Sequence, residues 1–365
     1  MPDNWYSVKN AGDVVSPALL VYPERIEENI KRMIRIAGKA DVLRPHVKTH
    51  KMSEVIRLQV SHGITKFKCS TIAEADVAAS AGGSDVMLAM QPVGVNIDRF
   101  FNLMNKYPSV KFSAIVDNMD TFRLIESQAQ NQKMQVNLWV DVNNGMNRTG
   151  ISPTKEARKL YLAIAIGSYC HAEGLHVYDG HLHESDVELR RLKCESAFEA
   201  IDKLIFYIRD SGLERPLVVA GGTPTFPFHA GKKYIQTSPG TCLLWDWGYS
   251  ERMPDLEFVH AAVLLTRVVS KPADHLICLD LGHKAIAAEM PHPRIRFFDL
   301  HVEKFVNHSE EHLVIESRHA GKYRCGDLIY GIPWHICPTV PRYPFAYTVH
   351  NNMIDGMWKV DARDR

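Results

Sequence analysis

The chain has 365 residues, enough for two average domains or for one large barrel with a smaller domain. Hydrophobic residues make up 45% of it and charged residues 23%, which excludes a disordered or fibrous protein. Lys and Arg number 43 against 42 Asp and Glu, so no large net charge attracts nucleic acid or an anionic membrane.

No segment predicts a membrane span or export. The longest apolar runs are far shorter than the ~20 residues of a membrane helix, and the N-terminus lacks the basic and then apolar pattern of a secretory signal. The seven cysteines are scattered and form no Cys-x-x-Cys pair, which favours reduced thiols. We therefore expect a cytoplasmic protein that binds neither nucleic acid nor membranes.

The first part of the chain alternates short β-rich runs with helical patterns. Residues 18–22 predict a strand, and residues 23–40 carry apolar side chains at three- and four-residue spacing, which predicts a helix. Further strands are predicted at residues 42–47, 66–70, 85–90, 110–116, 135–141, 174–178 and 217–220, and helices at residues 53–61, 73–81, 96–106, 119–130, 155–166 and 187–211. About eight such alternations predict an α/β protein with a (β/α)8 TIM barrel over residues 15–250, and a doubly wound open sheet is the main competitor.

After Trp247 the pattern changes to strands separated by turns rich in Pro, Gly and His. Strands are predicted at residues 257–269, 276–280, 303–306 and 313–315, with little helical periodicity. We interpret residues 251–365 as a separate β domain, on which residues 1–14 are expected to pack.

The string Arg44-Pro45-His46-Val47-Lys48-Thr49-His50-Lys51 follows a predicted strand, so in a barrel it lies near the catalytic rim. A lysine that points inward there is partly desolvated, which lowers its pKa and provides a neutral amine for a Schiff base. A solvated surface lysine is the alternative interpretation of both Lys48 and Lys51.

Two polar loops follow later strands. The loop 141–150 contains Arg148, which could hold a phenolate or a carboxylate or could form a surface ion pair. The loop 178–186 contains His181 and His183 beside carboxylates, which could be metal ligands, an acid–base pair or a polar turn.

Two further patterns predict ligand binding. The small-residue loops 220–225 and 238–241 offer backbone N–H groups and Thr hydroxyls to a phosphate, although plain turns look similar. His335 and Cys337 would share one face of an extended segment, within reach of one metal ion such as Zn²⁺. A buried cysteine beside a histidine is the alternative.

These strings occur together in one order: Ser16-Pro17-Ala18-Leu19, then Arg44 to Lys51, Gly145-Met146-Asn147-Arg148-Thr149-Gly150, Tyr178-Asp179-Gly180-His181, Ala220-Gly221-Gly222-Thr223-Pro224 and His335-Ile336-Cys337-Pro338-Thr339. In this the chain resembles the D-threonine aldolase / D-serine dehydratase family of alanine racemase-type (fold III) pyridoxal phosphate enzymes, over nearly its whole length. The resemblance implies an alanine-racemase-like barrel, a C-terminal β domain, a homodimer, pyridoxal 5'-phosphate and a divalent metal, Zn or Mn.

The resemblance also implies roles for single residues. Lys48 would be in Schiff-base linkage to pyridoxal phosphate, and Arg148 would contact the phenolic oxygen of the cofactor. Tyr178 matches the tyrosine near the pyridine ring, and His183 lies close by on the same loop. The phosphate-binding loops match at Gly222, Thr223, Gly240 and Thr241, and the metal pair matches at His335 and Cys337.

The implied substrate is a D-amino acid with a β-hydroxyl, and two lyase reactions compete for it. Aldol cleavage of D-threonine to glycine and acetaldehyde leads, with His183 or a metal-bound water as the base. Dehydration of D-serine or D-threo-3-hydroxyaspartate to a 2-oxo acid and ammonia is the alternative, and Cys337 is typical of that side of the family. Racemization is disfavoured, because no string indicates the tyrosine that a fold III racemase takes from its second domain. A non-catalytic protein that binds pyridoxal phosphate is the alternative from another class.

Overall fold

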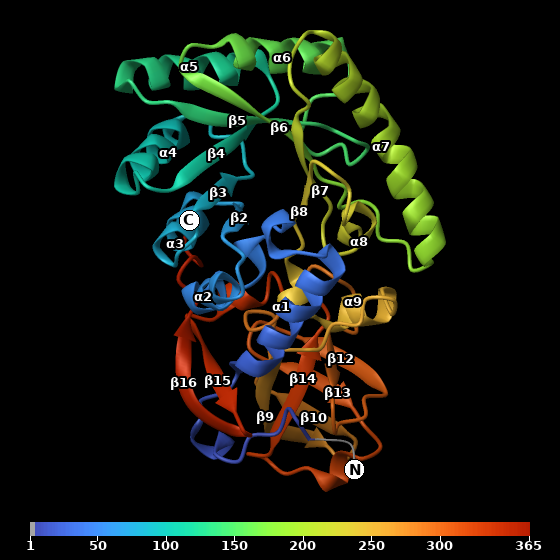
Figure 1. Ribbon diagram of the computed structural model, residues 1–365. Coiled ribbons are helices and arrows are strands. Elements are labelled where there is room, and N and C mark those ends of the chain that lie inside the picture. Colours follow the sequence, from blue (N-terminus) through green and yellow to red (C-terminus); the bar gives the residue numbers. More distant parts are fainter. Residues whose placement is uncertain (1–3) are drawn as a thin grey trace. The chain divides into compact units, whose positions relative to one another are not determined.

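The computed structural model describes residues 4–365, and the chain divides into two compact units (Figure 1). The sheet unit contains residues 4–30, 49–55 and 241–363. The barrel unit contains residues 31–48, 56–240 and 364–365. Two helices, α1 (Pro23–Ala37) and α2 (Ser53–Ser61), include residues of both units.

The barrel unit is built on a parallel sheet of seven strands in the order β2 to β8. Helices follow most of these strands, and Figure 1 shows α4 to α7 along the outside of β4 to β7. The strands are β2 (Lys66–Cys69), β3 (Asp85–Leu88), β4 (Lys111–Val116), β5 (Val136–Asp141), β6 (Cys170–Val177), β7 (Leu217–Ala220) and β8 (Ile235–Thr237). The helices are α3 (Ile72–Ser80), α4 (Val95–Lys106), α5 (Met119–Gln132), α6 (Lys155–Ile166), α7 (Val187–Asp210) and α8 (Phe226–His229).

An irregular segment takes the eighth position of the barrel. Leu43 bridges to Thr237 of β8 and His46 bridges to Lys68 of β2, both in parallel, so the segment joins the two edges of the sheet. The strand predicted at residues 42–47 is therefore reduced to two isolated bridges. Pro45 is one reason, because it has no N–H to donate to a neighbouring strand.

A buried ion pair anchors this segment. The Arg44 guanidinium is 1% exposed and donates to both carboxylate oxygens of Asp85 at 2.8 and 2.7 Å, and its Nε donates to Gln236 at 2.9 Å. Two parallel hydrogen bonds to a carboxylate fix the guanidinium in position as well as in charge. The ion pair thus fixes the backbone at Arg44, four residues before Lys48.

Large side chains fill the interior of the barrel below its carboxyl-end rim. Met87, Ile115, Trp139 and Val219 form one buried cluster from four different strands. The Trp139 indole also donates to Ser113 Oγ at 3.0 Å, so its polar atom is satisfied. A packed interior leaves the rim as the place for a ligand.

The sheet unit corrects one expectation. Residues 18–22 were expected to begin the barrel, and the predicted barrel range of 15–250 includes them. Instead β1 (Ala18–Val21) pairs antiparallel with β9 (Ala262–Ala273) and parallel with β15 (Phe345–His350). All four residues of β1 are buried, and a short run that is apolar on both faces does not reveal which sheet it joins.

The remaining strands of the sheet unit extend this sheet, with Tyr6, Val8 and Val14 packed against Leu20 and Leu265 in its core. Within residues 4–365, no helix is both long and apolar enough to cross a membrane. The remaining elements of this unit are β10 (Leu276–Leu279), β11 (Ile295–Phe297), β12 (Lys304–His308), β13 (Leu313–Glu316), β14 (Leu328–Pro333), β16 (Met353–Lys359) and α9 (Trp247–Arg252).

Candidate active site

The barrel unit contains a hollow of about 430 Å³ at the carboxyl ends of its strands. This volume is in the range of small-molecule sites, about 300–1,000 Å³. Three of the predicted cofactor-binding residues line it, namely Lys48, Arg148 and Tyr178, together with His46, Lys68 and His176. The structure therefore brings together residues that lie 130 positions apart in the chain, from Lys48 to Tyr178.

Lys48 lies in a short 3-10 turn, Val47–Thr49, directly after the irregular eighth segment. Its backbone N–H donates to Nδ1 of His46 at 3.2 Å, which holds the turn, and its side chain is exposed at the hollow. The desolvation that we expected for this lysine is absent from the structure. It occurs instead at Lys68, which no sequence motif singles out.

Lys68 is 3% exposed and belongs to a buried chain of polar groups. Its Nζ lies 3.2 Å from Nε2 of His176 and donates to Ser238 Oγ at 2.8 Å, and His176 Nδ1 lies 2.7 Å from Asp141 Oδ1. Burial and the charge of Lys48 lower the pKa of Lys68 to about 7. Burial and the charge of Lys68 also lower the pKa of His176, whereas at Asp141 the hydrogen bond and charge of His176 outweigh burial and keep the pKa low.

Arg148 and Tyr178 also line the hollow and lie against each other. The Arg148 guanidinium carbon lies 5.0 Å from the centre of the Tyr178 ring, a cation–π distance. The loop that carries Arg148 is closed by Gly150, whose φ of +96° favours glycine and whose N–H donates to Asp117 at 3.1 Å. An arginine on this loop can donate to an anionic oxygen of a ligand that lies against Tyr178.

The two predicted phosphate loops meet in the barrel unit. The Gly240 N–H donates to Thr223 Oγ1 at 3.2 Å, which joins one loop to the other. A Cβ added at Gly222 would lie 3.2 Å from Cε2 of Tyr178, so only glycine lets the first loop approach this ring without displacing it. Lys48, Arg148 and Tyr178 line one hollow, and the loop of Gly222 lies beside the Tyr178 ring, an arrangement that suits a flat, phosphate-bearing cofactor such as pyridoxal phosphate.

Two predicted site residues have other surroundings. His183 is exposed and is not among the residues that line the hollow. Thr241 belongs to the sheet unit, where its hydroxyl lies 3.3 Å from the sulfur of Cys337. Nothing in the sequence around His183 or Thr241 indicates that either residue lies away from the residues that line the hollow.

His335 and Cys337 lie in a turn after β14 rather than in the extended segment that we expected. Asp246 holds this turn by accepting from the Ile336 N–H at 3.0 Å, and the side chains of His335 and Cys337 contact each other directly. The sulfur of Cys337 also lies 3.1 Å from Thr49 Oγ1. The turn, rather than strand alternation, brings the two predicted metal ligands together.

The hydrogen bonding of His335 fits a metal ligand. Its Nδ1 pairs with Glu289 Oε1 at 2.5 Å, which leaves Nε2 for a metal, and metal-bound histidines commonly have such a carboxylate on the other nitrogen. Burial lowers the pKa of His335, but Cys337, Asp246 and Glu289 outweigh it and raise the pKa to about 9. A histidine with a cysteine beside it suits Zn²⁺, and two protein ligands leave positions for substrate or water. Glu289 is 46 residues from His335, so no local pattern pairs them.

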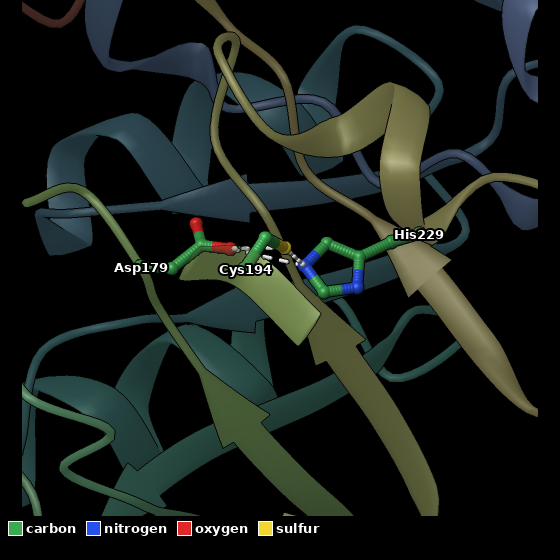
Figure 2. Close-up of side chains that lie close together, drawn as sticks. All are labelled: Asp179, Cys194 and His229. Atoms are coloured by element: carbon green, nitrogen blue, oxygen red, sulfur yellow. Dashed lines mark hydrogen bonds and ion pairs between the residues drawn. The ribbon is translucent and has the colours of Figure 1, made fainter. Parts of the chain in front are cut away.

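A second cluster of metal-ligand types lies in the barrel unit (Figure 2). His229 Nε2 lies 3.0 Å from Asp179 Oδ2 and 3.3 Å from the sulfur of Cys194, and all three side chains are buried. Within the described chain, however, Nδ1 of His229 has no hydrogen-bond partner, unlike Nδ1 of His335. Thr225 donates to the other oxygen of Asp179 at 2.7 Å. We interpret this cluster as a structural contact that joins the loop after β6 to α7, through Cys194, and to the end of α8, through His229.

Two family models match the chain. The model described as "Alanine racemase, N-terminal domain" covers residues 21–246, and the one described as "Putative serine dehydratase domain" covers residues 261–349. The first match includes more than half of the chain and most of the barrel unit.

Proteins with similar sequences and structures carry lyase names. The chain is 27% identical over 361 residues to the D-threonine aldolase of Arthrobacter sp, which covers 96% of this chain and 93% of that protein. It is 25% identical over 366 residues to the 3-hydroxy-D-aspartate aldolase of Paracoccus denitrificans (strain Pd 1222), with coverage of 97% and 93%. The crystal structure of the D-threonine aldolase from Filomicrobium marinum superposes with a TM-score of 0.86 at 25% identity over 96% of each chain. These findings confirm the resemblance and the alanine-racemase-like fold.

Proposed function

Because the chain belongs to the alanine racemase N-terminal domain family, we propose that it is a pyridoxal phosphate- and divalent metal-dependent lyase acting on D-β-hydroxy-amino acids. The leading reaction is that of a D-threonine aldolase, which cleaves D-threonine to glycine and acetaldehyde. The observation that carries this proposal is the hollow lined by Lys48, Arg148 and Tyr178 at the rim of the barrel. The names of the similar proteins support a lyase of this substrate class.

The chain's own residues supply the binding and positioning. Lys48 would provide the amine for a Schiff base with the cofactor, and Arg148 would donate to its phenolic oxygen. Tyr178 would lie against its ring, while the loops of Gly222, Thr223 and Gly240 would receive its phosphate. The bound cofactor supplies an electron sink for bonds at the Cα of the substrate.

In the sheet unit, His335 and Cys337 would hold the divalent metal. Glu289 orients His335 so that Nε2 is available, and Asp246 holds the turn between the two ligands. The metal supplies a Lewis acid that lowers the pKa of the β-hydroxyl. His183 stays a predicted base for the hydroxyl proton, although it is exposed and does not line the hollow.

Dehydration to a 2-oxo acid and ammonia is the second candidate. It is favoured by the match of residues 261–349 to a serine dehydratase domain and by the cysteine at position 337. The two reactions differ in the proton that is removed, the hydroxyl proton for cleavage and the Cα proton for dehydration.

The homodimer implied by the family also stays a prediction. Light scattering on the purified protein tests it by measuring the molar mass in solution.

Product analysis distinguishes these functions. The protein is incubated with pyridoxal phosphate and Zn²⁺ or Mn²⁺, and separately with D-threonine, D-serine and D-threo-3-hydroxyaspartate. Glycine and acetaldehyde from D-threonine, lost in Lys48→Ala, support the aldolase. A 2-oxo acid and ammonia without glycine would instead establish the dehydratase, and no product with bound cofactor would indicate a non-catalytic binding protein.

A further inference from the structure

We propose that Lys68 is a second lysine of the active site, which contacts bound pyridoxal phosphate through the one N–H position that the protein leaves open and sets the protonation of the cofactor. This inference rests on the proposed function and extends it to a residue that has no assigned role. Lys68 lies on β2, whereas Lys48 lies in the turn after the eighth segment, and both side chains line the same hollow.

The hydrogen bonds of Lys68 follow from the tautomer of His176. A carboxylate only accepts, so Nδ1 of His176 carries the proton that it shares with Asp141 over 2.7 Å. Nε2 of His176 is then an acceptor, and Lys68 donates to it over 3.2 Å. Asp141 is itself held through its other oxygen, which accepts from Gln91 at 2.9 Å. The direction of each bond from Lys68 to Asp141 is therefore determined.

The second bond of Lys68 leads to the phosphate loops. Ser238 donates its hydroxyl proton to the Gly221 carbonyl at 2.7 Å, so its oxygen must accept from Lys68 at 2.8 Å. Ser238 comes directly before Pro239 and Gly240, and Gly221 comes directly before Gly222. Lys68 is thus bonded to the point where the two loops meet.

Two of the three N–H positions of a lysine ammonium are occupied in this way. Among the residues that the structure describes, Lys68 has no third hydrogen-bond acceptor, and the Tyr178 ring centre lies 5.0 Å from its Nζ. A cofactor ring that lies against Tyr178 is therefore next to Lys68. Charged Lys68 offers a third N–H to that ring, and neutral Lys68 offers a lone pair.

The groups that face Lys68 come from several elements, and they decide its charge. His46, whose backbone bridges to that of Lys68, lines the same hollow, and Lys48 and Arg148 add positive charge. Asp141 on β5 and Asp179 after β6 add negative charge, and His176 and Tyr178 are polar neighbours. Burial and Lys48 together favour the neutral amine, so Lys68 changes protonation near neutral pH. Bonding of Lys48 to the cofactor would change the charge on the Lys48 nitrogen, which is one of the charges that act on Lys68.

The test compares charge-removing variants on one strand. Lys68→Gln keeps two N–H donors for His176 and Ser238 but removes the charge, and Lys66→Gln is the matched control at the other end of β2. The readouts are the dissociation constant of pyridoxal phosphate and the pH midpoint of the visible band of the bound cofactor. We expect Lys68→Gln to weaken binding by about tenfold, the loss of one charged hydrogen bond. We also expect it to raise the midpoint by about one unit, because a nearby cation is gone.

Lys68→Arg keeps the charge and should return the midpoint toward the wild-type value, which a merely structural role would not do. If Lys68→Gln and Lys66→Gln give equal midpoints and affinities, the inference is wrong. If the wild-type protein forms no visible band that depends on Lys48, the proposed function itself is wrong, which is a different result.

A second variant covers the case in which Lys68→Gln does not fold. Ser238→Ala removes one of the two acceptors of the Lys68 ammonium, so it should favour the neutral amine and raise the midpoint in the same direction as Lys68→Gln. Equal midpoints of Ser238→Ala and Lys66→Gln would overturn the inference.

Discussion

Replacing Glu289 by Gln tests whether His335 and Cys337 are a metal site. Glu289 Oε1 lies 2.5 Å from Nδ1 of His335, and the carboxylate both orients the ring and increases the basicity of Nε2. The glutamine side chain keeps an oxygen of the same reach but loses the negative charge. Loss of such a carboxylate partner weakens metal binding by about 10- to 100-fold, which corresponds to about 1.4–2.8 kcal/mol.

The assay is a competition titration of Zn²⁺ between a chelator and the metal-free protein. Glu311→Gln is the matched control, because Glu311 belongs to the same unit and is an exposed partner of Lys284. We expect the control to bind Zn²⁺ like the wild type and Glu289→Gln to bind it at least about tenfold more weakly. Equal affinity of Glu289→Gln and the wild type would refute the role of Glu289, and zinc binding that survives His335→Ala would refute the site.

Three other contacts lead to predictions of their own. The pKa of His335 is raised to about 9 without metal, so metal binding near pH 7 should release protons, and metal affinity should increase as the pH rises toward 9. Calorimetry in buffers of different ionisation enthalpy measures this proton release, and its absence would contradict the prediction. In urea titrations, Arg44→Met should lower the free energy of unfolding by about 3 kcal/mol, because it leaves Asp85 and Gln236 without their buried partner. The control Arg99→Met, at an exposed position, should change the free energy of unfolding little. Gly222→Ala should weaken pyridoxal phosphate binding by about tenfold or more through its clash with Tyr178, while Gly321→Ala, where a Cβ meets nothing within 4 Å, should not; equal dissociation constants would contradict this.

Periodicity predicted the regular elements of the barrel well. Helices α2 and α6 and strand β7 have the bounds that the pattern of apolar residues predicts, since each has a clear period and clear ends. Strand β8 was not predicted, because three residues, Ile235–Thr237, are too few to show a period. The sheet partners of β1 depend on contacts with residues more than 240 positions away, which no local pattern contains.

The candidate site shows the same division. Motifs of small or polar residues after predicted strands left several interpretations open, and the resemblance to the family implied the roles of Lys48, Arg148, Tyr178, Gly222 and Gly240. The structure brings three of these residues, Lys48, Arg148 and Tyr178, to one hollow. Lys68 lies inside a strand, where its side chain looks like any surface lysine until the buried His176 and Asp141 are found beside it.

Reduction of the loaded protein with borohydride, followed by peptide mass spectrometry, tests the central claim most directly. Reduction fixes pyridoxal phosphate permanently on the lysine that bonds it. A single pyridoxyl label on the peptide containing Lys48, absent in Lys48→Ala, is the predicted result. A label on Lys68 or another lysine, or no label at all, would contradict the assignment of the site.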